Sequence, residues 1–444
     1  MKRSVWAQQK LSENRTVHQE RAVLVAVLLD GRPLDDPELL ELGELARSAG
    51  ALVVSRVAQR RKAFNPATCV GKGKLDEIRQ RVDTFDADVV IFDNDLTPSQ
   101  IREIEKVAGC KVLDRSELIL DIFATRARTA EARLQVELAQ LEYTAPRLRG
   151  MWTHLERIAG AAGGIGAGSV GGIGTRGPGE RQIEIDRRLV GKRVAFLREK
   201  LREIDRRKVR EVRARGDFFT VSLVGYTNAG KSTLMNALTG AGALVEDKLF
   251  ATLDTLTRRW TLAGGGHVLL SDTVGFIRDL PHHLVASFRA TLEEAIHADL
   301  LLHVVDASSP HAEAQITAVN GVLGDLGAAE KPTLLVFNKI DAVRDEAALA
   351  VLRHQHENAL PISARGGAGL AELADRVHAR LHGDVKRMTL SLPARDGRGL
   401  DFVERFAEVL DRRWDDGRVL VDVRIAPRVL DHLHHIATDV RQVE

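Results

Sequence analysis

The chain has 444 residues, 44% of them hydrophobic and 28% charged, which predicts a protein of two to four ordinary globular domains. Its net charge is only +2, so any affinity for nucleic acid must come from a local patch, and no apolar run is long enough to span a membrane. The polar first residues are unlike a secretory signal. The two cysteines, Cys69 and Cys110, lack metal-binding spacing, which indicates a reducing cytosol without disulfides or structural zinc.

An N-terminal domain is expected over residues 1–125, in which residues 21–125 alternate strand-like apolar runs with helical patterns. Strands are expected at 21–29, 51–54 and 88–92, a helix at 39–49, and a further helix through Ile101 and Ile104. This alternation predicts a small α/β domain with a largely parallel sheet. The loop Gly71-Lys-Gly-Lys could hold an anion, but two glycines make a weak motif, and a tight turn before a helix is the favoured interpretation.

Residues 126–216 are predicted to form a helical linker. A helical pattern covers 115–157, a glycine-rich segment at 158–179 predicts a flexible loop, and 180–215 is helical again, so we expect an antiparallel helical hairpin. Residues 187–215 hold 13 Lys or Arg against 4 Asp or Glu. This excess of positive charge favours a contact with RNA phosphates, and a coiled partner arm rich in carboxylates is the main alternative.

A strand over 218–224 runs directly into the pattern G-x-x-x-x-G-K-[ST], which a helix follows. Gly225 and Gly230 let backbone N–H groups face phosphates, Lys231 lies beside the β- and γ-phosphates, and the Ser232 hydroxyl is expected to ligate Mg²⁺. The flanking strand and helix argue against a chance glycine-rich turn. The residues predicted to bind nucleotide here are Gly225, Tyr226, Thr227, Asn228, Ala229, Gly230, Lys231, Ser232 and Thr233.

Later segments, in the order of a GTP-binding domain (G domain), predict guanine as the base. Asp272-Thr-Val-Gly275 ends a strand and can hold Mg²⁺ through water while the Gly275 N–H meets the γ-phosphate. Asp341 can accept hydrogen bonds from both donors of the guanine edge, which adenine lacks, while Asn338 ties its loop to the P-loop. The residues predicted to bind are Asp272, Thr273, Val274, Gly275, Asn338, Lys339 (whose stem covers the base), Ile340, Asp341, Ser363, Ala364 (whose N–H reaches O6) and Arg365.

A switch loop is expected between the P-loop and Asp272, at Phe250, Ala251, Thr252, Leu253 and Asp254. Thr252 is the candidate that completes the Mg²⁺ shell when GTP is bound, with Thr255 and Thr257 as alternatives. The predicted catalytic set is therefore Lys231, Thr252, Asp272 and Gly275, with Ser232 and Thr252 as metal ligands.

Phe276 follows Gly275, at the place where many GTPases carry a glutamine that orients the attacking water. A phenylalanine cannot do this. The intrinsic rate could be low, backbone or Mg²⁺ could position the water, or a partner could supply the missing group. We favour slow hydrolysis that a partner stimulates; the alternative is that Phe276 only packs in the core while another side chain acts.

These motifs resemble those of the HflX family of translational GTPases, and the resemblance covers most of the chain. It is carried by Gly172-Ile-Gly-Thr-Arg-Gly-Pro-Gly-Glu180 with Glu184-x-Asp-Arg-Arg188 in the linker, by the Gly71 loop and Asp93–Gln100, and by the forms of the P-loop, the Phe250 segment and Asp272–Phe276. The chain departs from the family in a longer glycine-rich segment before Gly172.

The resemblance implies a GTPase that uses Mg²⁺, binds GTP and GDP, and contacts ribosomal RNA of the large ribosomal subunit through its N-terminal domain and basic linker. It also implies splitting or rescue of stalled ribosomes under stress. The alternatives are an RNA-remodelling nucleotidase and a GTP-dependent protein scaffold. We expect a P-loop G domain over 217–385, a small α+β domain over 386–444 and a cytoplasmic monomer, with peripheral membrane association left open.

Overall fold

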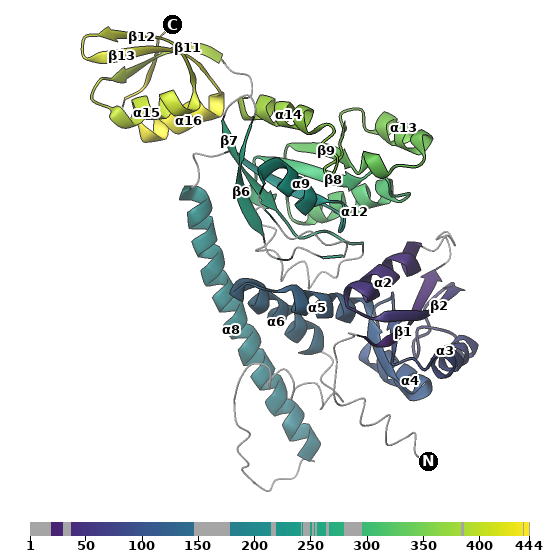
Figure 1. The fold of residues 1–444 in the computed structure, drawn as a ribbon. Coiled ribbons are helices and arrows are strands. Elements are labelled where there is room, and N and C mark those ends of the chain that lie inside the picture. The colour runs from purple at the N-terminus through teal and green to yellow at the C-terminus, as the bar shows by residue number, and fades with distance from the viewer. Residues whose placement is uncertain are drawn as a thin grey trace.

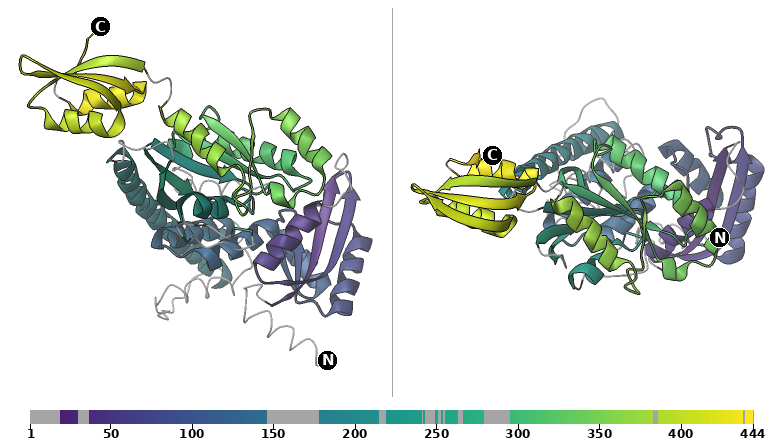
Figure 2. Two further views of the ribbon diagram at one scale, coloured as in Figure 1. Left: turned by 45° about the horizontal axis from the view of Figure 1, so that its top comes forward. Right: turned by 90° about the horizontal axis from the view of Figure 1, so that it is seen from above.

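The structure is a computed structural model, which describes residues 19–29, 37–145, 178–214, 219–240, 242, 249–250, 253, 255–262, 266–278, 295–382, 386–437 and 439–443. Within these residues the strands form three separate sheets. Figures 1 and 2 show the G domain between the N-terminal domain on one side and the C-terminal sheet on the other, with a long helix running beside them. No helix in this part of the chain is long and apolar enough to cross a membrane.

The N-terminal domain is a parallel sheet covered by helices on both faces. Its strands lie in the order β2-β1-β3-β4, from β1 (Arg21–Leu29), β2 (Leu52–Arg61), β3 (Val89–Phe92) and β4 (Lys111–Asp114). Helices α2 (Pro37–Ser48) and α5 (Arg115–Arg126) pack on one face, and α3 (Lys72–Phe85) and α4 (Pro98–Ala108) on the other. Both faces of β1 and β3 are buried, which explains their continuous apolar sequence. Gly71 precedes α3 as its N-cap, in keeping with the favoured turn interpretation.

The single helix expected over 115–157 is wrong, because the described part contains two helices. α5 ends at Arg126, where Ala127 takes an extended conformation, and Thr129 caps a new helix, α6 (Ala130–Thr144), by accepting a hydrogen bond from Ala132 N–H. One face of α6 packs with α5, and its other face packs on α8 (Pro178–Ala214) through an apolar cluster around Leu138 and Leu197. The expected glycine-rich loop lies almost wholly outside the described residues.

Two ion pairs connect α6 with α8. Arg193 pairs with Glu137 at 2.6 Å and Arg198 with Glu142 at 2.8 Å. These pairs add to the apolar contact between the two helices, and the antiparallel direction of the linker stays a prediction.

The G domain has a six-stranded sheet in the order β10-β9-β8-β5-β7-β6. The strands are β5 (Phe219–Gly225), β6 (Leu256–Thr261), β7 (His267–Asp272), β8 (Leu300–Asp306), β9 (Thr333–Asn338) and β10 (Leu360–Pro361). All pairs are parallel except β6 with β7, so the carboxyl ends of β5, β7, β8 and β9 lie at one edge. The described helices are α9 (Lys231–Thr239), α12 (Ala312–Asp325), η2 (Ile340–Ala342), α13 (Glu346–Gln355) and α14 (Leu370–His382).

The C-terminal segment forms an antiparallel sheet in the order β12-β13-β11-β14. Its elements follow as β11 (Lys386–Pro393), α15 (Gly397–Phe406), β12 (Glu408–Asp415), β13 (Arg418–Ile425), α16 (Pro427–Ile436) and β14 (Arg441–Val443), and the two helices pack with one face of the sheet. The expected fold class is confirmed: a P-loop G domain, an N-terminal α/β domain, a helical linker and a small α+β domain. The residue at which each domain begins stays a prediction.

Candidate nucleotide site

The P-loop connects the end of β5 to the start of α9, and two of its glycines are required by close contacts. Gly225 has φ +149°, and a methyl group built on it would lie 2.1 Å from the Val304 carbonyl oxygen of β8. Gly230 has φ +91°, and a methyl group there would lie 2.3 Å from Asn338 Nδ2. Any larger residue would push β8 or the Asn338 loop away. These glycines therefore allow three neighbouring segments to meet at the carboxyl edge of the sheet.

Lys231 lies at the first position of α9, with its ammonium group turned back into the loop. Nζ donates hydrogen bonds to the Gly225 and Tyr226 carbonyl oxygens at 3.1 and 2.9 Å, and the side chain is buried. Burial lowers the pKa of Lys231 to about 8, while the Asp272 carboxylate acts in the opposite direction. A buried ammonium held by carbonyl oxygens lacks a full counter-charge, so an anion at the loop would be strongly favoured.

Ser232 and Asp272 meet directly at the next position. Ser232 Oγ donates to Asp272 Oδ2 at 2.6 Å, and Asp272, at the end of β7, is 1% exposed. A hydroxyl and a carboxylate oxygen are the hard ligands that Mg²⁺ prefers, so this donor set fits the expected metal. Ala251, Thr252 and Asp254 lie outside the described residues, whereas Phe250 and Leu253 are buried. In the described residues, no group of three or more His, Cys, Asp or Glu could hold a metal.

The segment after Asp272 is attached to the P-loop by its backbone. Thr273 Oγ1 donates to the Leu223 carbonyl at 2.7 Å, and Phe276 N–H donates to the Gly225 carbonyl at 3.1 Å. Thr227 N–H in turn donates to the Phe276 carbonyl at 2.7 Å. The Phe276 side chain is 2% exposed and lies in a cluster with Val274, Phe250 and Tyr226. It therefore packs in the core and is not directed into an open site.

Asn338 joins the P-loop to the two segments expected to contact guanine. Its Nδ2 donates to the Ala229 carbonyl and its Oδ1 accepts from Ala364 N–H, both at 2.9 Å. Ser363 Oγ donates to Asp341 Oδ1 at 2.5 Å, which fixes the orientation of that carboxylate. The structure thus brings Asn338, Asp341, Ser363 and Ala364 together. Thr233 and Ile340 are half-buried nearby, whereas Arg365 is exposed.

Asp306 was not predicted from the sequence. It ends β8, and its Oδ2 accepts a hydrogen bond from Lys339 Nζ at 2.6 Å. Lys339 has φ +64°, a left-handed conformation that this ion pair helps to fix. The place of Asp306 in the sequence could have indicated a site residue. A polar residue at the carboxyl end of a parallel strand lies at the edge of the sheet where ligands bind in such folds.

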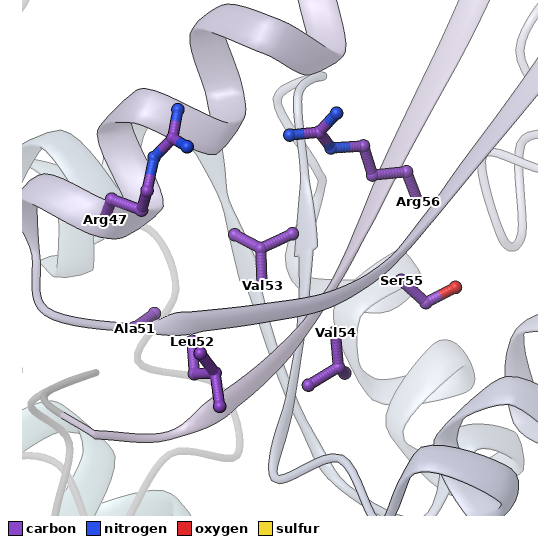
Figure 3. A pocket seen from close by; sticks show the side chains of 7 residues that line it. All are labelled: Arg47, Ala51, Leu52, Val53, Val54, Ser55 and Arg56. Atoms are coloured by element: carbon purple, nitrogen blue, oxygen red, sulfur yellow. The ribbon is translucent and has the colours of Figure 1, made fainter.

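A hollow of about 280 Å³ lies elsewhere, on the N-terminal domain at the edge strand β2. Figure 3 shows the guanidinium groups of Arg47 and Arg56 standing on the same side of β2, with Val53 between them. The other residues that line the hollow, from Ala51 to Ser55, belong to β2 and to the turn before it. No carboxylate is among its lining residues, so the hollow lacks a hydroxyl–carboxylate pair such as Ser232 and Asp272 at the P-loop.

Three family profiles match successive parts of the chain. A profile described as GTP-binding GTPase N-terminal matches residues 36–124, one described as GTP-binding GTPase Middle Region matches 126–215, and one described as 50S ribosome-binding GTPase matches 220–339. Together they cover more than half of the chain. The order of the three regions agrees with the order of the sheets and helices described above.

Curated relatives extend this match over nearly the whole length. The GTPase HflX of Caldanaerobacter subterraneus subsp. tengcongensis is 43% identical over 419 residues, 94% of each chain. The GTPase HflX of Escherichia coli K12 is 45% identical over 413 residues, 91% of this chain and 93% of the relative. A solved GTP-binding protein of Sulfolobus solfataricus in complex with GDP has a TM-score of 0.43 and 24% identity, covering 82% of this chain and 98% of that one; it adds nothing to the assignment. The chain belongs to the HflX family of GTPases, and it is a GTP-binding protein that hydrolyses GTP.

Proposed function

We propose that this GTPase binds the large ribosomal subunit, acts in the cytoplasm as a monomer and splits or rescues stalled ribosomes under stress, hydrolysing GTP to GDP and phosphate. The observation that carries the proposal is the exposed basic side of α8. Its described exposed cations are Arg188, Lys192, Arg198, Lys200, Arg202, Arg206 and Arg207. A rod bearing this charge suits RNA phosphates better than a protein surface of mixed charge.

Part of the positive charge on α8 is balanced within the protein. Glu137 and Glu142 of α6 pair with Arg193 and Arg198, so the carboxylate-bearing partner arm considered as an alternative exists in the same chain. Exposed pairs of this kind contribute only about 0–1 kcal/mol each, so phosphates could displace them. Arg188 and Lys192 lie beyond these pairs and remain the better candidates for RNA contact.

The N-terminal domain offers a second surface for ribosomal RNA. Lys62 is exposed just after β2, Lys72 and Arg79 are exposed on α3, and Phe64, in the connection between these two elements, is 43% exposed. Exposed cations and an exposed aromatic ring are the side chains that bind the phosphates and the unpaired bases of RNA. The 50S ribosome-binding description of the matched GTPase profile supports the same partner.

We infer the roles of the nucleotide site from its contacts. Lys231 would neutralise the β- and γ-phosphates, Ser232 and Thr252 would ligate Mg²⁺, Asp272 would hold that ion through water, and Gly275 N–H would meet the γ-phosphate. The metal, when bound, would offset the charge that develops on the phosphates. Asp341, oriented by Ser363, would read the guanine donors. Since Phe276 is buried, the water must be oriented by another group, and the ribosome is the proposed source of that help.

The test compares GTP turnover with and without purified large subunits at several salt concentrations. We expect a slow basal rate, a large increase with subunits, and loss of that increase at high salt. Arg188→Glu together with Lys192→Glu should reduce the slope of log affinity against log salt by about two. Arg353→Glu, an exposed change on α13, is the matched control. A rate of GTP hydrolysis that does not change when large subunits are added would refute the ribosomal role. GTP-dependent binding of a protein without a faster rate of GTP hydrolysis would favour the scaffold. ATP hydrolysis stimulated by RNA would favour the nucleotidase.

A further inference from the structure

The edge strand β2 contains a bulge that changes which of its side chains face α2. The register between β1 and β2 shifts by one residue after Val53, so Val54 is an extra residue in β2. Val53 packs with the apolar cluster on the α2 side of the sheet, whereas Val54 packs with the cluster on the α3 side. Ser55 Oγ accepts a hydrogen bond from Arg81 of α3 at 2.9 Å. Two successive residues thus face α3, and the bulge turns the next residue, Arg56, towards α2.

The bulge brings two guanidinium groups to one hollow. Arg56 Nη2 lies 3.1 Å from a methyl group built on Gly43, so the guanidinium of Arg56 lies against α2. Arg47 follows Gly43 by four residues and is therefore on the same face of that helix, one turn further on. Figure 3 shows both guanidinium groups on one side of β2, with Val53 between them, where they line the hollow described above. A helix and an edge strand thus each supply one positive charge to the same place.

Neither guanidinium group has a counter-charge within the described part of the chain. Among the residues that the structure describes, no ion pair or side-chain hydrogen bond involves Arg47 or Arg56, and no carboxylate lines the hollow. Arg81, on the other side of the same strand, is paired with Glu77 at 2.9 Å. Two guanidinium groups over one hollow repel each other, and an anion between them would replace that repulsion by attraction. The charge of the hollow therefore matches an anion.

The side chains that line the hollow favour the backbone of RNA over a free nucleotide. Guanidinium groups bind phosphate oxygens through paired N–H donors, and apolar neighbours such as Ala51 and Val53 can pack against a ribose. A free nucleotide also needs groups that hold its base, but no carboxylate, amide or aromatic side chain lines the hollow. Arg60 is exposed further along β2, on the same side as Arg56 by strand alternation. The positive charge thus continues along the strand, which suits a chain of phosphates better than a single anion.

We propose that the hollow between α2 and β2 is a phosphate site, in which Arg47 and Arg56 together hold one phosphodiester group of RNA. Phosphates are the expected target because duplex RNA presents them at its surface, while its base edges lie in a groove that side chains reach poorly. The site lies on the α2 side of the N-terminal sheet, whereas the exposed cations of α3 lie on the opposite side. The inference rests on the contact with ribosomal RNA proposed above for this domain.

The experiment measures dissociation constants of the full chain, with a bound non-hydrolysable GTP analogue, for purified large ribosomal subunits. Arg47→Lys and Arg56→Lys keep the charge but lose the paired donors, so each should weaken binding about three-fold. The corresponding substitutions by Gln should each weaken binding about ten-fold. Arg353→Lys, an exposed change on α13, is the control. Lysine variants that bind as tightly as this control would show that only diffuse charge matters, and would overturn the proposal.

The two glutamine substitutions in one chain test whether both arginines hold the same phosphate. The double variant should bind less than about 30-fold more weakly than the unaltered chain, since the second substitution removes a contact that the first has already broken. Its slope of log affinity against log salt should fall by about one, the value for one phosphate. Effects that multiply to about 100-fold would mean two independent contacts and would overturn the shared site.

A further measurement needs no substitution and separates RNA from other sources of phosphate. Phenylglyoxal modifies accessible guanidinium groups, and mass spectrometry locates the modified residues. A single-stranded oligouridine should protect Arg47 and Arg56 but not Arg353, whereas ATP or inorganic phosphate at the same phosphate concentration should protect them less. Equal protection by ATP overturns the assignment to RNA. If the unaltered chain does not bind large subunits at all, the proposed ribosomal function fails. If it binds them and the arginine variants behave as the control, only this site fails.

Discussion

Asn338→Ala should weaken nucleotide binding strongly although Asn338 is assigned no contact with the phosphates. The substitution removes the hydrogen bonds to the Ala229 carbonyl and from Ala364 N–H, both 2.9 Å long, from a side chain that is 2% exposed. Each bond contributes about 1 kcal/mol, and a buried group left without a partner costs about 1–3 kcal/mol. Allowing for water that reaches the opened loops, we expect a loss of about 2–4 kcal/mol, or a 30- to 700-fold weaker affinity.

The assay is titration of a fluorescent GDP analogue, with Asn358→Ala as the control because Asn358 is exposed on a loop of the same domain. Thermal unfolding of the nucleotide-free protein measures the cost to the fold itself. A GDP affinity within about three-fold of the unaltered chain would refute the reasoning, since the two hydrogen bonds would then not hold the loops that bind nucleotide. A large drop in stability with unchanged relative affinity would assign Asn338 to the fold alone.

Three further changes test other parts of the molecule. Asp341→Asn should weaken GTP and admit xanthine nucleotides, whose edge lacks one guanine donor; unchanged GTP affinity in a titration would contradict that assignment. Burial lowers the pKa of His303 in the folded protein from 6.5 to about 4. As the pH falls, the unfolded chain therefore takes up a proton on His303 before the folded protein does. This difference should lower the unfolding free energy by about 3 kcal/mol between pH 6.5 and 4. In denaturant titrations, His303→Gln should remove this contribution to the fall in unfolding free energy between pH 6.5 and 4. If the variant and the unaltered chain lose unfolding free energy equally over this range, the assignment to His303 is contradicted. Leu197→Ala should cost about 2–4 kcal/mol because Leu197 is fully buried between α6 and α8, whereas Leu189→Ala, 58% exposed, should cost little in thermal unfolding.

The fold class and the P-loop could be predicted because their signals are local. A strand that runs into G-x-x-x-x-G-K-S and then a helix specifies its own turn, and polar residues at the ends of parallel strands meet at one edge whatever the rest of the chain does. The same reasoning placed Asn338 beside the P-loop. Most residues of the candidate site could therefore be named from the sequence alone.

What could not be predicted depends on contacts between distant segments. In the sequence, nothing distinguishes Tyr226 from the variable positions of a P-loop. Its hydroxyl group donates a hydrogen bond to Glu41, which lies 185 residues away in the sequence. The break between α5 and α6 was missed because Thr129 is a weak cap signal within a continuous helical pattern. Asp306 was overlooked since no motif required it.

The position after Gly275 offers a last test, because its side chain serves packing rather than chemistry. Phe276 shares a buried cluster with Phe250 and Phe123, so it belongs to the contact between the G domain and the N-terminal domain. Phe276→Gln would bury an amide without a partner at a cost of about 1–3 kcal/mol, and would not bring it to the attacking water. Single-turnover hydrolysis should therefore stay slow while thermal stability falls, and Phe276→Leu should keep more of that stability. A Gln variant that hydrolyses GTP much faster at unchanged stability would mean that this side chain faces the γ-phosphate, and the buried position would have to be abandoned for the GTP-bound state.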